Sequence, residues 1–370
     1  MIKLIDLSFY AYTDHARFSQ VLKSLRQSLG YAKFLNNNIN TQFVKHFDSN
    51  SYETIDGIRY AGFKSRNKFW YIPFNTLRYI KREKPDIILV QGLKFPIQTI
   101  ALRLFVGKRP KIIVQHHGEL PLKGLKHPFS KLADMAVDAY IFTSRGNFKL
   151  WEKNNNIRKN RPCFEVLEAS TNFQKQDNKL SKNKLGIKTD NNFLWVGRLD
   201  DNKDPLTVLN GFEQYLTIEP DAKLHMIYQY DGLLGKVKNT INNSTLLKNA
   251  VRLVGKVAHD ELVFWFSACE FFILGSHKEG SGYALIEAMA CGCIPVVTDI
   301  PSFNKITSDG RYGFLYEVGN TGSLFSVLKN LHAIDKTEMS EKIVEHFSEE
   351  LSFKKIADNL YGIFRKLVTE

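Results

Sequence analysis

Short apolar runs alternate with longer segments of helical periodicity along most of the chain. In the first half, runs of strand length lie at residues 2–7, 86–90, 111–115, 139–143 and 163–167. An amphipathic helix is expected over residues 14–29, directly after the first of these runs. Alternation of strands and helices is typical of a doubly wound parallel sheet. We therefore predict an α/β fold with a Rossmann-like N-terminal domain over residues 1–170.

A second series of the same kind follows a polar stretch at residues 171–190. Its strand-length runs lie at residues 193–196, 223–228, 251–254, 271–274, 294–298 and 313–316. A chain of 370 residues exceeds the size at which one core usually keeps growing, so two domains are expected. We predict a linker at residues 171–190, a second Rossmann-like domain at residues 191–350, and a terminal helical segment at residues 351–370.

The segment from Glu279 to Glu287 combines a glycine-rich loop, the start of a helix and two acidic residues. We expect a loop over Gly280, Ser281 and Gly282 and a helix over residues 283–291. The first turn of such a helix offers amides and a partial positive charge, which suits a phosphate. Glu287, about one turn further in, suits the hydroxyls of a ribose, and Glu279 faces whatever lies beyond the phosphates. The alternative is a helix that only packs.

Two cations follow the first strand of the second series. Arg198 offers a planar fork of donors and Lys203 a compact charge, a pair suited to a diphosphate. Gly255 and Lys256 end another strand of the same sheet, where a glycine allows close approach. A solvated loop and a plain turn are the alternatives. In the first half, an apolar strand ends in His116, His117 and Gly118, and a purely structural histidine is the alternative there.

The motif from Glu279 to Glu287, with Ala-Met-Ala-Cys-Gly and Pro-Val-Val after it, resembles the signature of retaining glycosyltransferases of family four, the glycosyl transferases group 1. The resemblance implies the GT-B fold, in which two Rossmann-like domains face an interdomain cleft and the terminal helix crosses back to the N-terminal domain. One departure is the aromatic segment at residues 8–12, where the family often has a Gly-Gly turn.

The resemblance also implies roles for individual residues. Arg198 and Lys203 would bind the donor diphosphate and assist its departure, and Glu279 would hold hydroxyls of the donor sugar. His117, with His116 as the alternative, would contact that sugar near the reacting carbon. Contacts with the nucleotide sugar are expected at these positions: Gly255, Lys256, Gly280, Ser281, Gly282, Tyr283, Leu285 and Glu287.

The net charge of +13 is unevenly distributed. Residues 1–170 carry 28 Lys and Arg against 13 Asp and Glu, whereas the rest carries 23 against 25. This asymmetry indicates an anionic partner for the first half, either membrane headgroups or a charged acceptor, unless the surface is simply solvated. Nucleic acid is disfavoured because no recognised motif accompanies the charge.

We expect a cytoplasmic protein, with peripheral contact at the inner membrane face as one reading of its basic half. No apolar run reaches 18 residues, and the four cysteines lack zinc-ligand spacing, so they are expected to be reduced core residues.

The predicted function is transfer of a hexose-type sugar, with retention, from a nucleoside-diphosphate sugar to a glycan, lipid-linked or other cell-envelope acceptor. UDP and GDP remain open as the nucleotide. No cofactor and no metal are expected to be required, since no Asp-x-Asp motif stands where a metal-dependent transferase needs one. The alternatives are a nucleotide-sugar epimerase or hydrolase on the same fold, an inactive nucleotide-sugar binding protein, and a basic nucleic-acid-binding protein.

Overall fold

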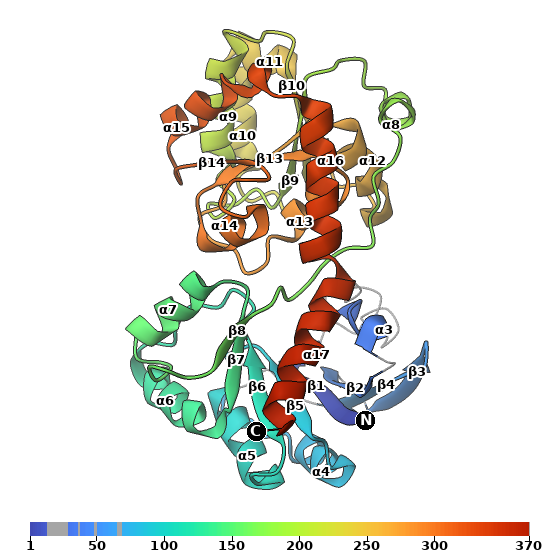
Figure 1. Ribbon diagram of the computed structural model, residues 1–370. Helices are drawn as coiled ribbons and strands as arrows, with labels where there is room; N and C mark the ends of the chain where they lie inside the picture. Colours follow the sequence, from blue (N-terminus) through green and yellow to red (C-terminus); the bar gives the residue numbers. More distant parts are fainter. Residues whose placement is uncertain (13–28, 36–37, 48–49, 65–68, 370) are drawn as a thin grey trace. The chain divides into compact units, whose positions relative to one another are not determined.

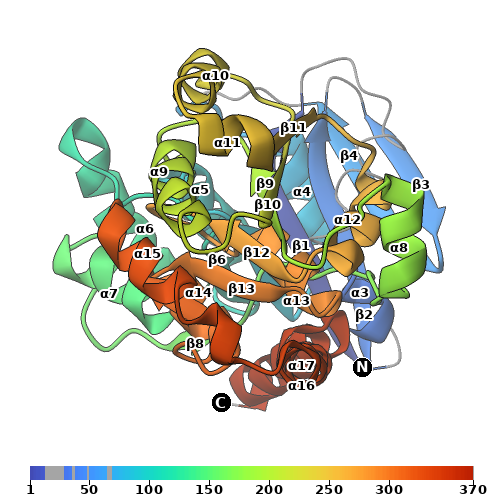
Figure 2. The same ribbon diagram turned by 90° about the horizontal axis from the view of Figure 1, so that it is seen from above.

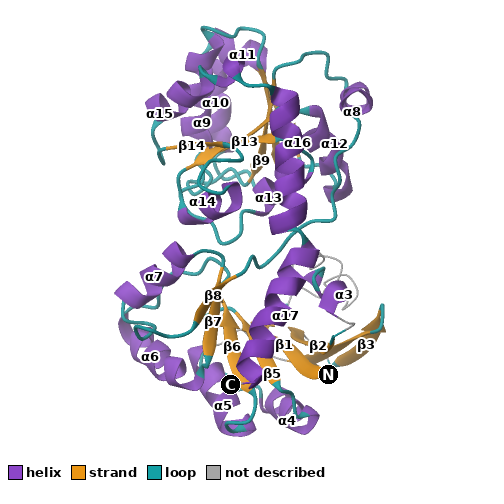
Figure 3. Ribbon diagram, in the orientation of Figure 1, coloured by secondary structure: helices purple, strands orange, loops and turns teal. Residues whose placement is uncertain are grey.

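The computed structural model describes residues 1–12, 29–35, 38–47, 50–64 and 69–369, and it divides into two compact units. The first unit comprises residues 1–170 and 353–370, and the second comprises residues 171–352. Each unit contains a mainly parallel sheet covered by helices (Figures 1 and 3). The predicted α/β class with two Rossmann-like sheets is thereby confirmed. The helix expected over residues 14–29 lies outside the described residues except at its last position.

The described part of the first unit holds an eight-stranded sheet in the order β3-β4-β2-β1-β5-β6-β7-β8. Only the β3–β4 pair is antiparallel. The chain runs outward from β1 to β2 and β4 and then returns to β5, so the strand order reverses between β1 and β5. The strands are β1 (Ile2–Ala11), β2 (Ile39–Phe47), β3 (Ser51–Ile55), β4 (Ile58–Lys64), β5 (Ile87–Gln91), β6 (Lys111–Gln115), β7 (Ala139–Phe142) and β8 (Cys163–Glu165).

The core of the first unit lies on the apolar strands and the helices beside them. Ile88 and Val90 of β5 and Ile112 of β6 are fully buried, as the nearly continuous apolar sequence of parallel strands leads one to expect. The helices are α3 (Ala32–Leu35), α4 (Phe74–Glu83), α5 (Pro96–Val106), α6 (His127–Ala136), α7 (Arg145–Lys153) and α17 (Phe353–Thr369). The terminal helix α17 belongs to this unit and packs close to α3. A side chain at Gly30, just before α3, would meet the Phe353 ring at 2.5 Å.

The described part of the second unit holds a six-stranded parallel sheet in the order β11-β10-β9-β12-β13-β14. Its strand order reverses between β9 and β12, and open α/β sheets bind ligands beyond the carboxyl ends of the strands at such a point. The strands are β9 (Asn192–Gly197), β10 (Lys223–Tyr228), β11 (Val251–Gly255), β12 (Phe271–Leu274), β13 (Ile294–Thr298) and β14 (Phe314–Tyr316).

Helices of the second unit lie in two groups beside this sheet. The helices α9, α10, α11 and α15 form one group, and α8, α12, α13 and α16 form the other (Figures 1 and 2). Their bounds, with the short α14, are α8 (Asn178–Leu185), α9 (Pro205–Leu216), α10 (Leu234–Asn242), α11 (Thr245–Ala250), α12 (Leu262–Ala268), α13 (Tyr283–Ala290), α14 (Pro301–Thr307), α15 (Thr321–Leu328) and α16 (Lys336–His346).

Two sequence expectations differ from the structure. The segment at residues 171–190, expected as a linker, lies in the second unit and contains α8, which Asp177 caps. Its polar residues are partly structural, because the Asn178 amide donates to the Ser267 carbonyl at 2.9 Å. Residues 8–11, where the family often has a Gly-Gly turn, continue β1 beyond the strand expected at residues 2–7. In the part of the chain that the structure describes, no helix is both long and apolar enough to span a bilayer.

Candidate functional site

The loops after β9 and β12 are joined at the point where the strand order of the second unit reverses. A side chain at Gly275 would approach the Asp204 carbonyl oxygen to 2.9 Å, so only glycine permits this contact. The His277 amide donates to the Asn202 carbonyl at 2.8 Å, and the Asn202 side chain donates to the Lys278 carbonyl at 3.1 Å. The two loops therefore form one braced structure at the carboxyl ends of the strands.

Lys203 and Glu279 form an ion pair between these loops. Their side chains are only 18% and 15% exposed, so the charges are partly withdrawn from water. The Lys203 amide donates to the Asp200 carboxylate at 3.0 Å, which fixes the loop that carries the ammonium group. The structure thus brings together the predicted diphosphate cation and the predicted sugar-binding carboxylate.

Arg198 is the more accessible of the two predicted cations. Its side chain is 64% exposed and pairs with Asp200 at 2.8 Å. The guanidinium group also lies 5.2 Å from the centre of the Tyr230 ring. This arrangement presents the guanidinium at the surface of the same loop that carries Lys203.

The helix α13 begins where the motif predicts, directly after Gly282. Gly282 has φ of +59°, and a side chain there would clash with the Phe303 ring at 2.7 Å. Ser281 is buried and Gly280 is half-buried, whereas Tyr283 is exposed. Leu285 is fully buried and its amide bonds the Gly282 carbonyl at 2.9 Å, so its side chain supports the helix from within the core.

Glu287 lies one turn into α13 and is held by a histidine that the sequence analysis did not single out. The Nε2 of His259 is 2.7 Å from the Glu287 carboxylate, and the Phe173 ring stacks on His259 at 4.9 Å. The hydrogen bond with Glu287 and the nearby negative charges outweigh burial and raise the pKa of His259. The sequence could have indicated His259 by its position, because it lies only four residues after Gly255, at the end of a strand of the same sheet.

Gly255 ends β11 with φ of +81°, and nothing lies within 4 Å of the position that a side chain would take. Lys256, the next residue, is exposed. The backbone at this strand end therefore borders open space, and the predicted contact with a ligand stays a prediction.

His117 lies at the end of β6 in the first unit, and its side chain is 30% exposed. Its Nδ1 contacts the Glu168 carboxylate, and its Nε2 lies 2.6 Å from the Gln91 side-chain oxygen. The Glu119 carboxylate accepts hydrogen bonds from the His117 amide at 2.7 Å and the Leu93 amide at 3.0 Å. Burial alone would lower the pKa of His117, but the charges of Glu168 and Glu119 outweigh it and raise this pKa.

His116, the alternative to His117, is a core residue. It is 3% exposed, and its ring stacks on Phe142 with a centroid separation of 4.5 Å. Burial lowers the pKa of His116, which keeps the ring neutral near pH 7. Of the two histidines, His117 is therefore the one that a ligand can reach.

The aromatic residues at the end of β1 pack mainly against one another. Tyr12 stacks on Phe47 at 5.7 Å and meets Tyr10 edge-on at 5.2 Å. Tyr10 remains 53% exposed.

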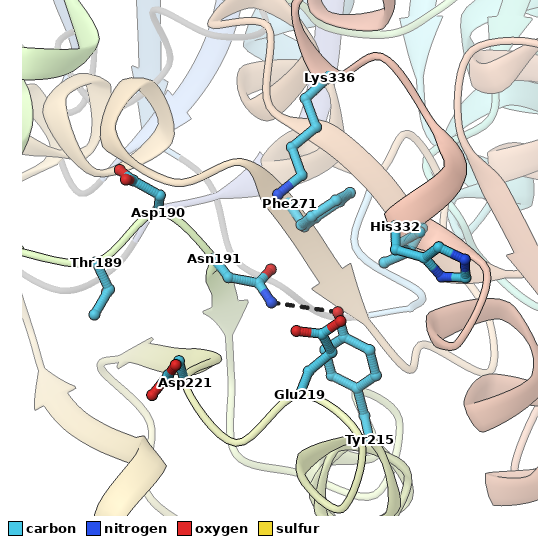
Figure 4. Close-up of a pocket in the computed structure, with 10 residues that line it drawn as sticks. Thr189, Asp190, Asn191, Tyr215, Glu219, Asp221, Phe271, His332 and Lys336 are labelled. Atoms are coloured by element: carbon cyan, nitrogen blue, oxygen red, sulfur yellow. Dashed lines mark hydrogen bonds between the residues drawn. The ribbon is translucent and has the colours of Figure 1, made fainter.

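A cavity of about 560 Å³ lies at the opposite edge of the second sheet, at the amino ends of β9, β10 and β12 (Figure 4). Its lining includes the carboxylates of Asp190, Glu219 and Asp221 and the ammonium group of Lys336. Asn191 donates to the Tyr215 hydroxyl at 3.3 Å within it. This cavity is separate from the loops that carry Lys203 and Glu279.

Comparison with solved structures defines the class of fold. The chain aligns over its full length with sucrose-phosphate synthase from Thermosynechococcus elongatus, with a TM-score of 0.72 and 16% identity. It aligns over 99% of its length with a glycosyltransferase from Rickettsia africae, which is covered to 98%, with a TM-score of 0.73 and 13% identity. The chain therefore has the GT-B fold.

A family model matches most of the second unit. Residues 177–346 match the model of the glycosyl transferases group 1, the family that the sequence resembles, and this stretch includes the loops, α13 and Glu287. In this stretch the chain is similar to the glycosyl transferases group 1, which supports glycosyltransferase activity.

Relatives of known activity align over most of the chain. One is an N-acetylgalactosamine-N,N'-diacetylbacillosaminyl-diphospho-undecaprenol 4-alpha-N-acetylgalactosaminyltransferase of Campylobacter jejuni, 27% identical over 74% of this chain and 75% of that protein. Another is a GDP-mannose:cellobiosyl-diphosphopolyprenol alpha-mannosyltransferase of Xanthomonas oryzae, 24% identical over 70% of this chain and 67% of that protein.

The roles of the individual residues remain predictions. Among the described residues, no three His, Cys, Asp or Glu side chains gather as a metal site. The independence from metal that the sequence analysis expects likewise stays a prediction.

Proposed function

We propose that the chain transfers a hexose-type sugar, with retention of configuration, from a nucleoside-diphosphate sugar to a lipid-linked or glycan acceptor. The observation that carries the proposal is the Lys203–Glu279 pair beside the start of α13 at the switch point of the second sheet. A cation, a helix N-terminus and a carboxylate at one strand edge suit a diphosphate with a sugar attached.

In this proposal, Lys203, Arg198 and the amides at the start of α13 stabilise the negative charge on the leaving diphosphate. Glu287 holds the ribose and Glu279 holds hydroxyls of the donor sugar. The bond between C1 of the sugar and the phosphate oxygen breaks while the acceptor oxygen bonds to C1 on the same face. The acceptor proton passes to the leaving phosphate, and no metal is required.

The donor nucleotide is tested by thermal unfolding with UDP, GDP and ADP and their sugars. A ligand that binds only the folded state raises the midpoint, by RT ln(1 + [L]/Kd) in free energy. One nucleoside diphosphate is expected to stabilise the wild-type protein but not the Glu287→Ala variant. If every nucleotide shifted the unfolding midpoint equally, and by the same amount in both proteins, the placement of the nucleotide at Glu287 would be refuted.

A surface of the first unit supports a lipid-linked acceptor. The outward positions of α6 are Pro128, Lys131, Leu132 and Met135, and its acidic residue, Asp134, is fully buried. Leu132 is 50% exposed and Met135 is 67% exposed, although the outer face of a helix in a soluble domain is usually polar.

Further apolar and basic residues adjoin this helix. Trp70 is 67% exposed and meets the Phe129 ring at 5.1 Å, and Leu125, just before α6, is 93% exposed. Three exposed lysines, Lys123, Lys126 and Lys131, accompany them. Exposed apolar side chains among positive charges suit the interface of an anionic bilayer. We therefore extend the proposal to peripheral binding at an anionic membrane through this α6 surface.

Vesicle sedimentation tests the membrane contact. Leu132→Gln with Met135→Gln, and separately Lys123→Gln with Lys126→Gln and Lys131→Gln, are expected to weaken binding to phosphatidylglycerol vesicles. Each lysine near an anionic surface contributes about fivefold to the affinity, so loss of all three charges should weaken binding about a hundredfold. The matched controls in the second unit are Leu180→Gln and the Lys179, Lys188 and Lys238 to Gln triple variant. The membrane contact would be refuted if all variants bound phosphatidylglycerol vesicles equally. It would also be refuted if the wild-type protein bound phosphatidylcholine vesicles as strongly.

A further inference from the structure

A buried carboxylate lies behind His117 in the sheet of the first unit. Asp6 of β1 is fully buried and pairs with Lys45 of β2 at 2.9 Å. It accepts hydrogen bonds from the Tyr31 hydroxyl at 2.6 Å and from the Gln91 side-chain nitrogen at 2.5 Å. An ionised carboxylate can only accept hydrogen bonds.

The orientation of the Gln91 amide follows from this contact. Its NH2 group must face Asp6, so its oxygen faces His117. The Nε2 of His117, 2.6 Å from that oxygen, must therefore carry a hydrogen.

The second ring nitrogen has a different acceptor. The Nδ1 of His117 contacts the carboxylate of Glu168, whose side chain is 4% exposed. An ionised Glu168 accepts a hydrogen bond there, which requires a hydrogen on Nδ1 as well. Both ring nitrogens are then protonated, which is the imidazolium form.

We propose that Gln91 and Glu168 are positioning residues that hold His117 as an imidazolium, with Asp6 orienting the Gln91 amide. The charges around the ring are consistent with this state. Glu119 adds a second carboxylate, buried His116 is neutral, and Lys45 opposes the positive charge.

This state limits what His117 can do in the transfer reaction. An imidazolium has no free lone pair on nitrogen, so it can donate a hydrogen bond or contribute charge but cannot take a proton from the acceptor. That limit agrees with proton transfer to the leaving phosphate, and this step, like the kcat measurements below, rests on the proposed function.

Nitrogen-15 NMR of histidine-labelled protein tests the protonation directly, because ring nitrogen shifts distinguish the imidazolium from either neutral tautomer. In the wild-type protein, His117 is expected to be doubly protonated at pH 7. Glu168→Gln keeps an acceptor oxygen but removes the charge, so the His117 midpoint is expected to fall. His46, whose pKa burial lowers to about 4, serves as a neutral internal reference.

Glu165→Gln is the matched control. It makes the same chemical change three residues earlier in the chain, at a carboxylate that accepts from the Arg145 amide. It is expected to leave the His117 midpoint unchanged. A wild-type ring with one unprotonated nitrogen at pH 7, or equal midpoints in the two glutamate variants, would overturn the proposal.

A second variant separates positioning from folding. Gln91→Met removes the acceptor for Nε2 and is expected to lower kcat about tenfold to a hundredfold, the scale of one hydrogen bond to a charged group. The pH profile of kcat in Glu168→Gln should move with the NMR midpoint. A profile identical to that of the wild-type enzyme would also overturn the proposal.

If Glu168→Gln does not fold, the wild-type spectrum and Gln91→Met decide the question. A wild-type protein that shows the expected His117 titration but has no transfer activity would contradict only the proposed function.

Discussion

The Lys203–Glu279 pair makes a quantitative prediction about stability. Glu279→Gln keeps the shape of the side chain but leaves the Lys203 ammonium, which is 18% exposed, without its counter-charge. Exposed pairs contribute about 0–1 kcal/mol, whereas breaking a fully buried pair costs about 3–5 kcal/mol. For this partly buried pair we expect a loss of about 1–2 kcal/mol. In a unit of this size, that corresponds to roughly 2–8 °C in the unfolding midpoint.

The assay is thermal unfolding without nucleotide, compared with a matched surface variant. Glu338→Gln breaks the Lys342–Glu338 pair of α16, whose side chains are 56% and 61% exposed, and should lower the unfolding midpoint much less. Equal shifts in the two variants would refute the view that the Lys203–Glu279 pair is partly desolvated.

The same variant also separates binding from turnover. Glu279→Gln frees Lys203 for a diphosphate, so nucleotide affinity should be retained while turnover of the nucleotide sugar falls. Glu287→Ala should instead weaken nucleotide binding chiefly. Calorimetric titration that gives one affinity for wild type and both variants would contradict these assignments.

Three further predictions concern pH, backbone conformation and metal. The pKa of His259 is raised in the folded state, so its contribution to stability is complete below the unfolded value of about 6.5 and is lost as pH rises through the folded value. The stability difference between wild type and His259→Gln in urea unfolding should therefore shrink at alkaline pH. Gly282→Ala should cost about 1–3 kcal/mol through strain at φ of +59° and should also displace the Phe303 ring. Gly186→Ala, at φ of +67° in open space, is its control in the same unfolding assay, and equal costs would refute the clash. Chelation of divalent ions should leave turnover unchanged, and lost activity that magnesium restores would contradict metal independence.

The fold was largely readable from the sequence where strands are buried on both faces. The strands Lys111–Gln115 and Ile294–Thr298 have the predicted bounds because short runs rich in β-branched residues are typical of buried parallel strands. Lys223–Tyr228 also has the predicted bounds, although its sequence is mixed. The strands β2, β3 and β4 were not predicted. They belong to the edge half of the first sheet, where polar residues such as Gln42, Lys45 and His46 interrupt the apolar pattern although they are buried.

The sequence predicted the candidate site only where the residues that form it are close together in the chain. The loop at Gly282 and the helix with Glu287 are neighbours in sequence, so their geometry follows from the motif. The partners of these residues are distant in sequence, as Glu279 is from Lys203, Glu287 from His259, and His117 from Gln91 and Glu168. Such pairings depend on which strands adjoin, and strand order is not encoded in local periodicity.

The most direct test of glycosyl transfer at this site is nucleoside diphosphate release coupled to formation of a glycosylated product. The wild-type enzyme should release one nucleoside diphosphate for each sugar transferred, and the product should keep the anomeric configuration of the donor. The Lys203→Met variant should lose most of this turnover, because the charge on the leaving diphosphate is no longer stabilised. Full turnover by Lys203→Met, or a product of inverted configuration, would contradict the account.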